Sequence, residues 1–178
     1  MPTSRAQRVA LTAALAALAG CAGAPVIAPP DVPAALRPAA GQEVFLQARA
    51  SGVQIYECAA RPDQPAAYAW IFRAPEATLV DRHGRVLGKH YAGPTWEYAD
   101  GSKIVGEKIG SKPVDGAIPL LLIKVTTTSG KGKLSAVKYV KRDLTSGGTP
   151  PTVPADEAHL GKTENVPYHA TYVFYAGS

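Results

Sequence analysis

The densest group of potentially reactive side chains lies in thirteen consecutive residues, His90 to Ser102. This segment contains one imidazole, two carboxylates and three aromatic rings. Because an imidazole titrates near neutral pH, it can act in acid–base catalysis when a carboxylate lies close to it. His90, Glu97 and Asp100 are therefore the candidate catalytic residues. This hypothesis requires their side chains to converge in one pocket.

The same segment supports two other interpretations. Aromatic rings beside polar groups form platforms on which ligands stack, with cationic side chains holding an anionic ligand. The candidate ligand-binding residues are Tyr91, Trp96, Lys103, Lys138 and Arg142. Alternatively, the segment is structural, since Gly93-Pro94 and Asp100-Gly101 are typical of turns and Trp96 can anchor a core.

Positive charge is concentrated in one part of the chain. The formal net charge is +5, and residues 103–142 contain nine lysines and arginines against two acidic residues. A basic surface of this kind attracts anionic partners of the cell envelope, such as lipid phosphates. The alternative is that lysines protect exposed strand edges from pairing with other chains.

The motifs of several enzyme classes are missing. Gly101 to Gly106 has the glycine spacing of a phosphate-binding loop, but Glu107 stands where lysine is required. There is neither a dinucleotide-binding glycine motif nor a G-x-S-x-G hydrolase motif. The four histidines show no zinc-binding spacing. We therefore expect no cofactor and no metal.

The elements that position these residues are predicted to be strands. After Gly41, short alternating runs recur between turn signals, and no helical periodicity is sustained. The expected strands cover residues 53–58, 68–72, 77–80, 86–91, 96–98, 103–105, 118–128, 134–142 and 168–175. Residues 118–128 form a continuous apolar run, which predicts burial on both faces. The pattern predicts one all-β domain of nine or ten strands, an antiparallel sandwich or barrel.

Residues 145–167 form an unusually long connection before the last expected strand. Long connections without secondary structure are uncommon in compact domains. We expect either a functional loop or a flap over the sheet.

The N-terminus has the features of a secretion signal. Arg5 and Arg8 precede an apolar run too short to span a bilayer, and Leu18-Ala19-Gly20 leads directly to Cys21. The pattern resembles the lipobox signals of bacterial lipoproteins, which implies cleavage before Cys21, acylation of Cys21 with chains such as palmitate, and anchoring in the envelope. Ala22 implies the outer membrane. Residues 1–20 are thus the predicted signal peptide, 21–40 a lipidated cysteine and flexible linker, and 41–178 the β domain.

Several short segments of the chain resemble those of one uncharacterised family. They include Tyr56-Glu57-Cys58, the string from His90 to Glu97, and Val166-Pro167-Tyr168. The chain resembles DUF3455, a domain of unknown function in secreted bacterial and fungal proteins. Leu120 stands where this family often has tryptophan, and residues 149–165 lack the second cysteine. The resemblance therefore implies that a disulfide from Cys58, plausible in relatives, cannot form here.

These observations favour an envelope-anchored lipoprotein whose non-catalytic β domain binds an unknown ligand or protein partner. The expected partners are the membrane, through the N-terminal lipid, and an anionic envelope ligand or a protein. A nucleic acid partner is not expected outside the cell membrane. The alternative is an enzyme that acts on an extracytoplasmic small molecule or glycan, using the acid–base residues of the segment from His90 to Ser102.

Overall fold

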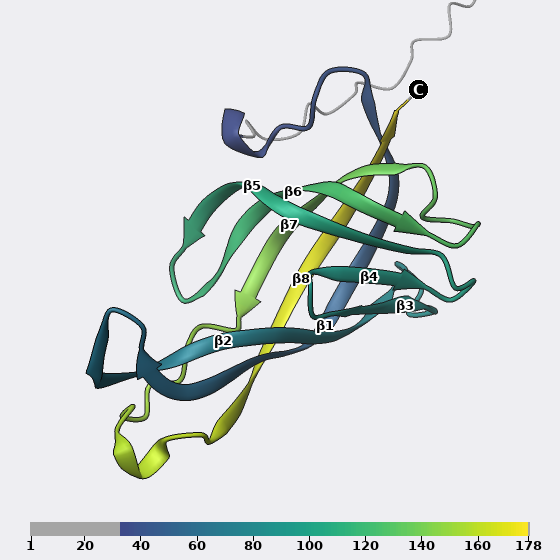
Figure 1. The fold of residues 1–178 in the computed structure, drawn as a ribbon. Coiled ribbons are helices and arrows are strands. Elements are labelled where there is room, and N and C mark those ends of the chain that lie inside the picture. The colour runs from purple at the N-terminus through teal and green to yellow at the C-terminus, as the bar shows by residue number, and fades with distance from the viewer. Residues whose placement is uncertain (1–32, 178) are drawn as a thin grey trace, which may run out of the picture. The chain divides into compact units, whose positions relative to one another are not determined.

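The computed structural model describes residues 33–177, which form one antiparallel sheet closed into an eight-stranded barrel (Figure 1). The strands are β1 (Gln42–Arg61), β2 (Gln64–Val80), β3 (Val86–Tyr91), β4 (Thr95–Tyr98), β5 (Lys103–Val114), β6 (Ala117–Ser129), β7 (Val137–Gly147) and β8 (Thr163–Gly177). Each strand pairs with the next along the chain, and β8 pairs with β1. The predicted all-β fold is confirmed, in its barrel form.

The strands are longer and fewer than predicted. Residues 68–72 and 77–80, expected as two strands, both belong to β2. A register shift separates them, because Ile55 pairs with Ala74 whereas Tyr56 pairs with Phe72. Arg73 is thus an extra residue on β2, and such a bulge bends a strand without ending it.

The core fills the barrel with side chains from alternating positions. On β8, Tyr172 and Phe174 are both buried. Both rings lie edge-on to the buried Trp96, with centroid distances of 5.4 and 6.5 Å. Aromatic pairs favour this geometry, so Trp96 anchors the core.

The packed part of the chain begins before the predicted boundary at Gly41. A 3-10 turn, η1 (Ala34–Leu36), packs against β5 and β6 with Leu36 only 1% exposed. Gly110 makes this possible, because a Cβ atom there would collide with the carbonyl oxygen of Ala35. Leu122, opposite Gly110 in the sheet, lies on the same side and is buried. The turn η1 thus accounts for two-sided burial in residues 118–123, but the prediction is wrong for the rest of the range, because Lys124 and residues 126–128 are exposed.

The long connection is shorter than expected and spans residues 148–162, including the 3-10 turn η2 (Glu157–His159). It lies against the arm formed by β1 and β2 (Figure 1). Trp70 Nε1 donates to the carbonyl oxygen of Val153 at 3.0 Å. The fully buried Cys58 thiol donates to the carbonyl oxygen of Asp156 at 3.7 Å. These contacts attach the connection at the position where the resemblance implied a disulfide in relatives.

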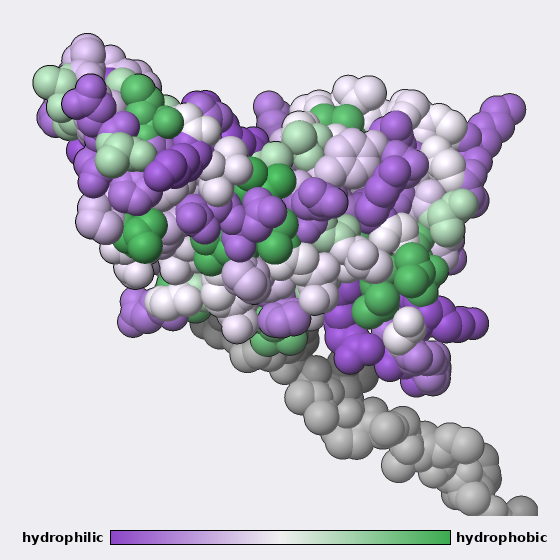
Figure 2. Space-filling view, turned by 90° about the horizontal axis from the view of Figure 1, so that it is seen from below, coloured by the Kyte–Doolittle hydropathy of each residue, from purple (hydrophilic) through white to green (hydrophobic). Residues whose placement is uncertain are grey.

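Polar side chains cover most of the face drawn in Figure 2, and the hydrophobic residues there form small, separate groups. Within residues 33–177, no helix has the length and apolar character needed to cross a membrane. The predicted signal peptide and Cys21 lie outside the residues that the structure describes.

Candidate functional site

A cavity of about 460 Å³ enters the barrel, and all eight strands contribute to its wall. Residues from the buried core form its inner part, whereas the more exposed Phe72, Arg73 and Lys108 lie around its opening. The volume is within the range of small-molecule sites, about 300–1,000 Å³. Eight-stranded barrels are also wide enough to hold one small ligand.

Aromatic rings form much of the cavity wall. They belong to Tyr56, Phe72, His90, Trp96 and Tyr172. The His90 and Trp96 rings are stacked, with centroids 4.5 Å apart and an interplanar angle of 15°. Tyr172 lies edge-on to His90 at 4.9 Å. The inner wall is therefore a set of closely packed rings, and Phe72, which is 48% exposed, is the most accessible ring of the cavity.

His90 is a neutral part of this wall. Its Nδ1 atom lies 2.8 Å from the carbonyl oxygen of Thr95, which can only accept, so Nδ1 carries the proton. Burial lowers the pKa of His90 to about 4, against the opposing effect of the Thr95 hydrogen bond, and the charge of Arg142 lowers it further. At neutral pH the ring is uncharged and its Nε2 atom is an acceptor.

Arg142 is a buried cation, only 9% exposed, in the wall of the cavity. Its Nε atom donates to the carbonyl oxygen of Pro119 at 3.0 Å. Within residues 33–177, Arg142 forms no ion pair, and the cavity lining contains neither Asp nor Glu. A buried charge without a counter-charge is costly. A bound anion would therefore stabilise Arg142, and the described residues do not supply one.

Two further polar groups in the cavity residues lack partners. Gln54 is 2% exposed and Trp96 is 1% exposed, and both line the cavity. Gln54 Nε2 and Trp96 Nε1 have no hydrogen-bond acceptor among the described residues. Most buried donors in folded proteins are paired, so two unpaired donors beside one cavity are a functional signal.

The cavity opening carries additional positive charge. Arg73 pairs with Glu57, with 3.1 Å between Arg73 Nε and Glu57 Oε2. Lys108 forms no ion pair with any residue in the described range. An anion entering the barrel would thus pass an uncompensated lysine before it reaches Arg142.

Glu97 lies on the opposite face of the sheet from His90. The register pairs His90 with Trp96 and Lys89 with Glu97, and adjacent residues of a strand face opposite sides. Glu97 accepts from the Tyr91 hydroxyl at 2.7 Å and pairs with Lys89 and Lys103 at 3.4 and 3.3 Å. The Tyr91 hydrogen bond, followed by Lys103, holds the pKa of Glu97 below its usual range. Tyr91 and Lys103 therefore belong to an outer charged cluster and not to the cavity.

Asp100 has a structural role in the turn between β4 and β5. Its carboxylate accepts from Ser102 Oγ at 2.6 Å and from the backbone N–H of Lys133 at 2.7 Å. These bonds connect the turn to the chain between β6 and β7. The side chains of His90, Glu97 and Asp100 therefore do not converge in one pocket, contrary to the prediction.

Of the candidate ligand-binding residues, Trp96 and Arg142 line the cavity, whereas Lys138 is exposed on β7 and does not line it.

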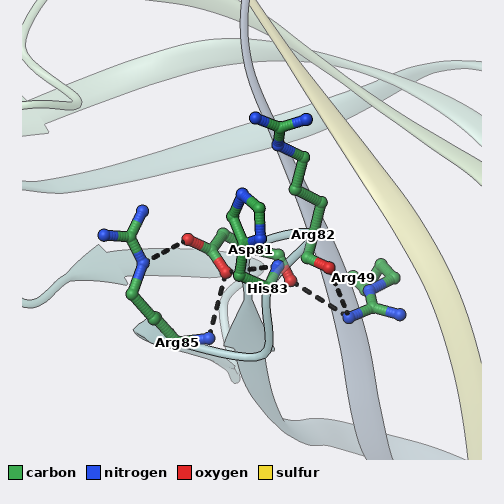
Figure 3. A network of polar contacts seen from close by, with 5 residues as sticks. All are labelled: Arg49, Asp81, Arg82, His83 and Arg85. Atoms are coloured by element: carbon green, nitrogen blue, oxygen red, sulfur yellow. Dashed lines mark hydrogen bonds and ion pairs between the residues drawn. The ribbon is translucent and has the colours of Figure 1, made fainter.

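A second charged cluster, at the turn between β2 and β3, is shown in Figure 3. Asp81 accepts from the backbone N–H groups of His83 and Arg85 and from Arg85 Nε, at 2.8, 3.0 and 2.7 Å. Although desolvation raises the pKa of Asp81, its hydrogen bonds, above all those with Arg85, lower it to about 2. Arg49 donates to the carbonyl oxygen of Asp81. Asp81 pairs with Arg85, and Arg49 binds the backbone of the turn, so these contacts are structural, whereas the Arg82 guanidinium points away from them (Figure 3).

Sequence reasoning missed several cavity residues, chiefly Gln54, Tyr56, Lys108 and Tyr172. One signal was present in β1, where the buried positions include Ala48, Ala50, Gln54, Tyr56 and Cys58. A glutamine in an otherwise mostly apolar inward row indicates a special environment.

No group of three or more His, Cys, Asp or Glu side chains in the part of the chain that the structure describes could hold a metal ion.

The model of a family described as a protein of unknown function, DUF3455, matches residues 38–176. The chain belongs to this family. No curated protein and no solved structure matches the chain.

Proposed function

We propose that this member of the DUF3455 family is an envelope-anchored lipoprotein whose barrel binds a small molecule in the cavity lined by His90, Trp96 and Arg142. One observation carries the proposal: an aromatic-lined cavity of about 460 Å³ adjoins buried polar groups that lack partners among the described residues. Binding sites typically combine an apolar wall with a few fixed polar groups.

The proposed role is binding without catalysis. Glu97 faces away from the cavity, and Asp100 is held in a turn by Ser102 and Lys133. His90 remains in the wall, but its Nδ1 atom is engaged with Thr95 and its pKa of about 4 keeps it uncharged. The cavity thus has fixed hydrogen-bonding groups but lacks the expected acid–base partner.

The anchor in this proposal is Cys21, acylated after removal of residues 1–20, which places the barrel at the outer membrane. Since η1 begins at Ala34, the connection between Cys21 and the packed part is short. Cells grown with labelled palmitate should incorporate label into the protein, and a Cys21→Ser variant should lose both the label and its place in the membrane fraction. Equal labelling of the variant would overturn the anchoring proposal.

Thermal unfolding tests the cavity. We expect at least one compound in a panel of small organic acids, glycan fragments and lipid headgroups to raise the Tm of the full chain. A ligand at 100 times its Kd stabilises the folded state by about 2.7 kcal/mol, which is a readily measured shift.

A cavity-filling variant locates the binding. Leu121 lines the cavity, so Leu121→Trp should remove the ligand-induced shift. Val86→Trp is the matched control, because Val86 is 65% exposed and outside the cavity lining. If Leu121→Trp folds and leaves the shift intact, the ligand binds elsewhere and the cavity is not the site.

A further inference from the structure

We infer that the ligand of the cavity is a flat organic monocarboxylate whose carboxylate binds Arg142. This inference rests on the proposed function, because it assigns a chemical class to the molecule in the same cavity.

The charge of the cavity requires an anion. Arg142 contributes a permanent positive charge, since its guanidinium stays protonated in proteins. No acidic side chain lines the cavity, and Arg142 forms no ion pair within the described range. His90 adds no second inner charge, because it is neutral at pH 7. Lys108 also lines the cavity but is exposed to solvent, so Arg142 is the one buried positive charge, and a single negative charge such as a carboxylate balances it.

The available donors also fit a carboxylate. Arg142 Nε is already bonded to Pro119 and the guanidinium also donates to the Tyr172 hydroxyl, which leaves its remaining N–H groups for the ligand. A guanidinium binds a planar carboxylate through two parallel hydrogen bonds. Gln54 Nε2, which has no acceptor among the described residues, is a neutral donor from another strand of the same wall.

The shape of the wall selects a flat molecule. The Phe72 ring lines the cavity and is 48% exposed, whereas the packed rings of His90, Trp96 and Tyr172 form the inner wall. An aromatic or conjugated body makes favourable stacked or edge contacts with such rings. Trp96 Nε1 is a second unpaired donor, suited to a further acceptor on the ligand.

Titration calorimetry on the full chain, purified in detergent, tests this class. The probes are benzoate, trans-cinnamate and 2-naphthoate, each compared with its neutral amide and its phosphonate, and with cyclohexanecarboxylate as the non-planar acid. We expect at least one flat carboxylate to bind about 10 to 100 times more tightly than its amide, as for a charge-assisted hydrogen bond. The phosphonate and the non-planar acid should bind more weakly.

Variants connect this preference to the named residue. Arg142→Gln should lose the preference for carboxylate over amide, and Arg142→Lys should retain only part of it. Lys138→Gln is the matched control, because Lys138 is an exposed cation on the same strand and outside the cavity lining. The comparison of acid with amide on the unaltered protein remains decisive if the Arg142 variants fail to fold.

The outcomes separate the two proposals. If neutral amides bind as tightly as the acids, and Leu121→Trp abolishes both, the cavity is a ligand site but the carboxylate inference is wrong. If carboxylates bind but Leu121→Trp has no effect, the cavity proposal fails together with this inference. Binding by phosphonates in preference to carboxylates would also overturn the inference.

Discussion

Lowering the pH from 7 to 5 should destabilise the fold through His90. The imidazole is 3% exposed, and burial lowers its pKa to about 4 in the folded protein. In the unfolded chain the ordinary value of about 6.5 applies. Between these two values the unfolded chain binds more protons than the folded protein, so the free energy of unfolding falls as the pH falls.

The size of the effect follows from the two pKa values. The difference between 6.5 and about 4 corresponds to roughly 3 kcal/mol when the pH is below both values. Of this, about 2 kcal/mol is lost between pH 7 and pH 5. The carboxylates with lowered pKa values, such as Asp100, lose their contribution at lower pH, as the pH falls below their ordinary value. The range from pH 7 to pH 5 therefore favours histidines over carboxylates, and the difference from a variant without the His90 imidazole gives the contribution of His90.

Urea unfolding at pH 7, 6 and 5 measures the effect, and a His90→Asn variant is the control. The asparagine amide can still donate toward Thr95 but does not titrate. The unaltered protein should lose stability across this range, and the variant should not. An NMR titration of the His90 ring provides a second measurement that does not depend on the variant. Equal slopes for both proteins, or a ring that titrates near pH 6.5, would refute the reasoning.

Three further predictions concern packing and backbone conformation, all measured by urea unfolding. Leu36→Ala should lower the free energy of unfolding by about 2–3 kcal/mol, and Gly110→Ala should displace η1. Because both changes disrupt the same contact, the double variant should lose less stability than the sum of the two single losses. Full additivity would contradict the proposed contact. Trp96→Ala should cost about 3–5 kcal/mol because the ring is 1% exposed, and a loss below about 1 kcal/mol would show that the cavity collapses around it. Leu144 is 76% exposed with a φ of 48°, so Leu144→Asn should stabilise the fold by about 1 kcal/mol, and a loss of stability would point to a packing role for the leucine.

Local turn chemistry made parts of the fold predictable. The Asp100-Gly101 turn and the strand Val86–Tyr91 lie where the sequence indicates, because the signals for both are contained in adjacent residues. The bulge at Arg73 was not predictable in this way. The bulge depends on the register between β1 and β2. In the sequence, a break in the alternation of apolar and polar residues looks the same whether it marks a bulge or a turn.

The cavity was only partly predictable for a similar reason. Trp96 and Arg142 were chosen for their chemistry, and both line it. Glu97 was chosen as a carboxylate close to His90 in the sequence, but His90 pairs with Trp96, and Glu97, the next residue on the strand, faces the opposite side. Gln54 and Tyr172 join the site only through closure of the sheet, which pairs segments far apart in the chain.

The pairing of the first and last strands also determines when the fold can be completed. Gln42 pairs with Gly177 and Glu57 with Thr163, and β1 and β8 lie side by side along the barrel (Figure 1). Until the C-terminal strand β8 is in place, β1 and β7 each keep an unpaired edge, and such edges promote aggregation. A chain that ends before Thr163 should therefore aggregate instead of forming a smaller barrel.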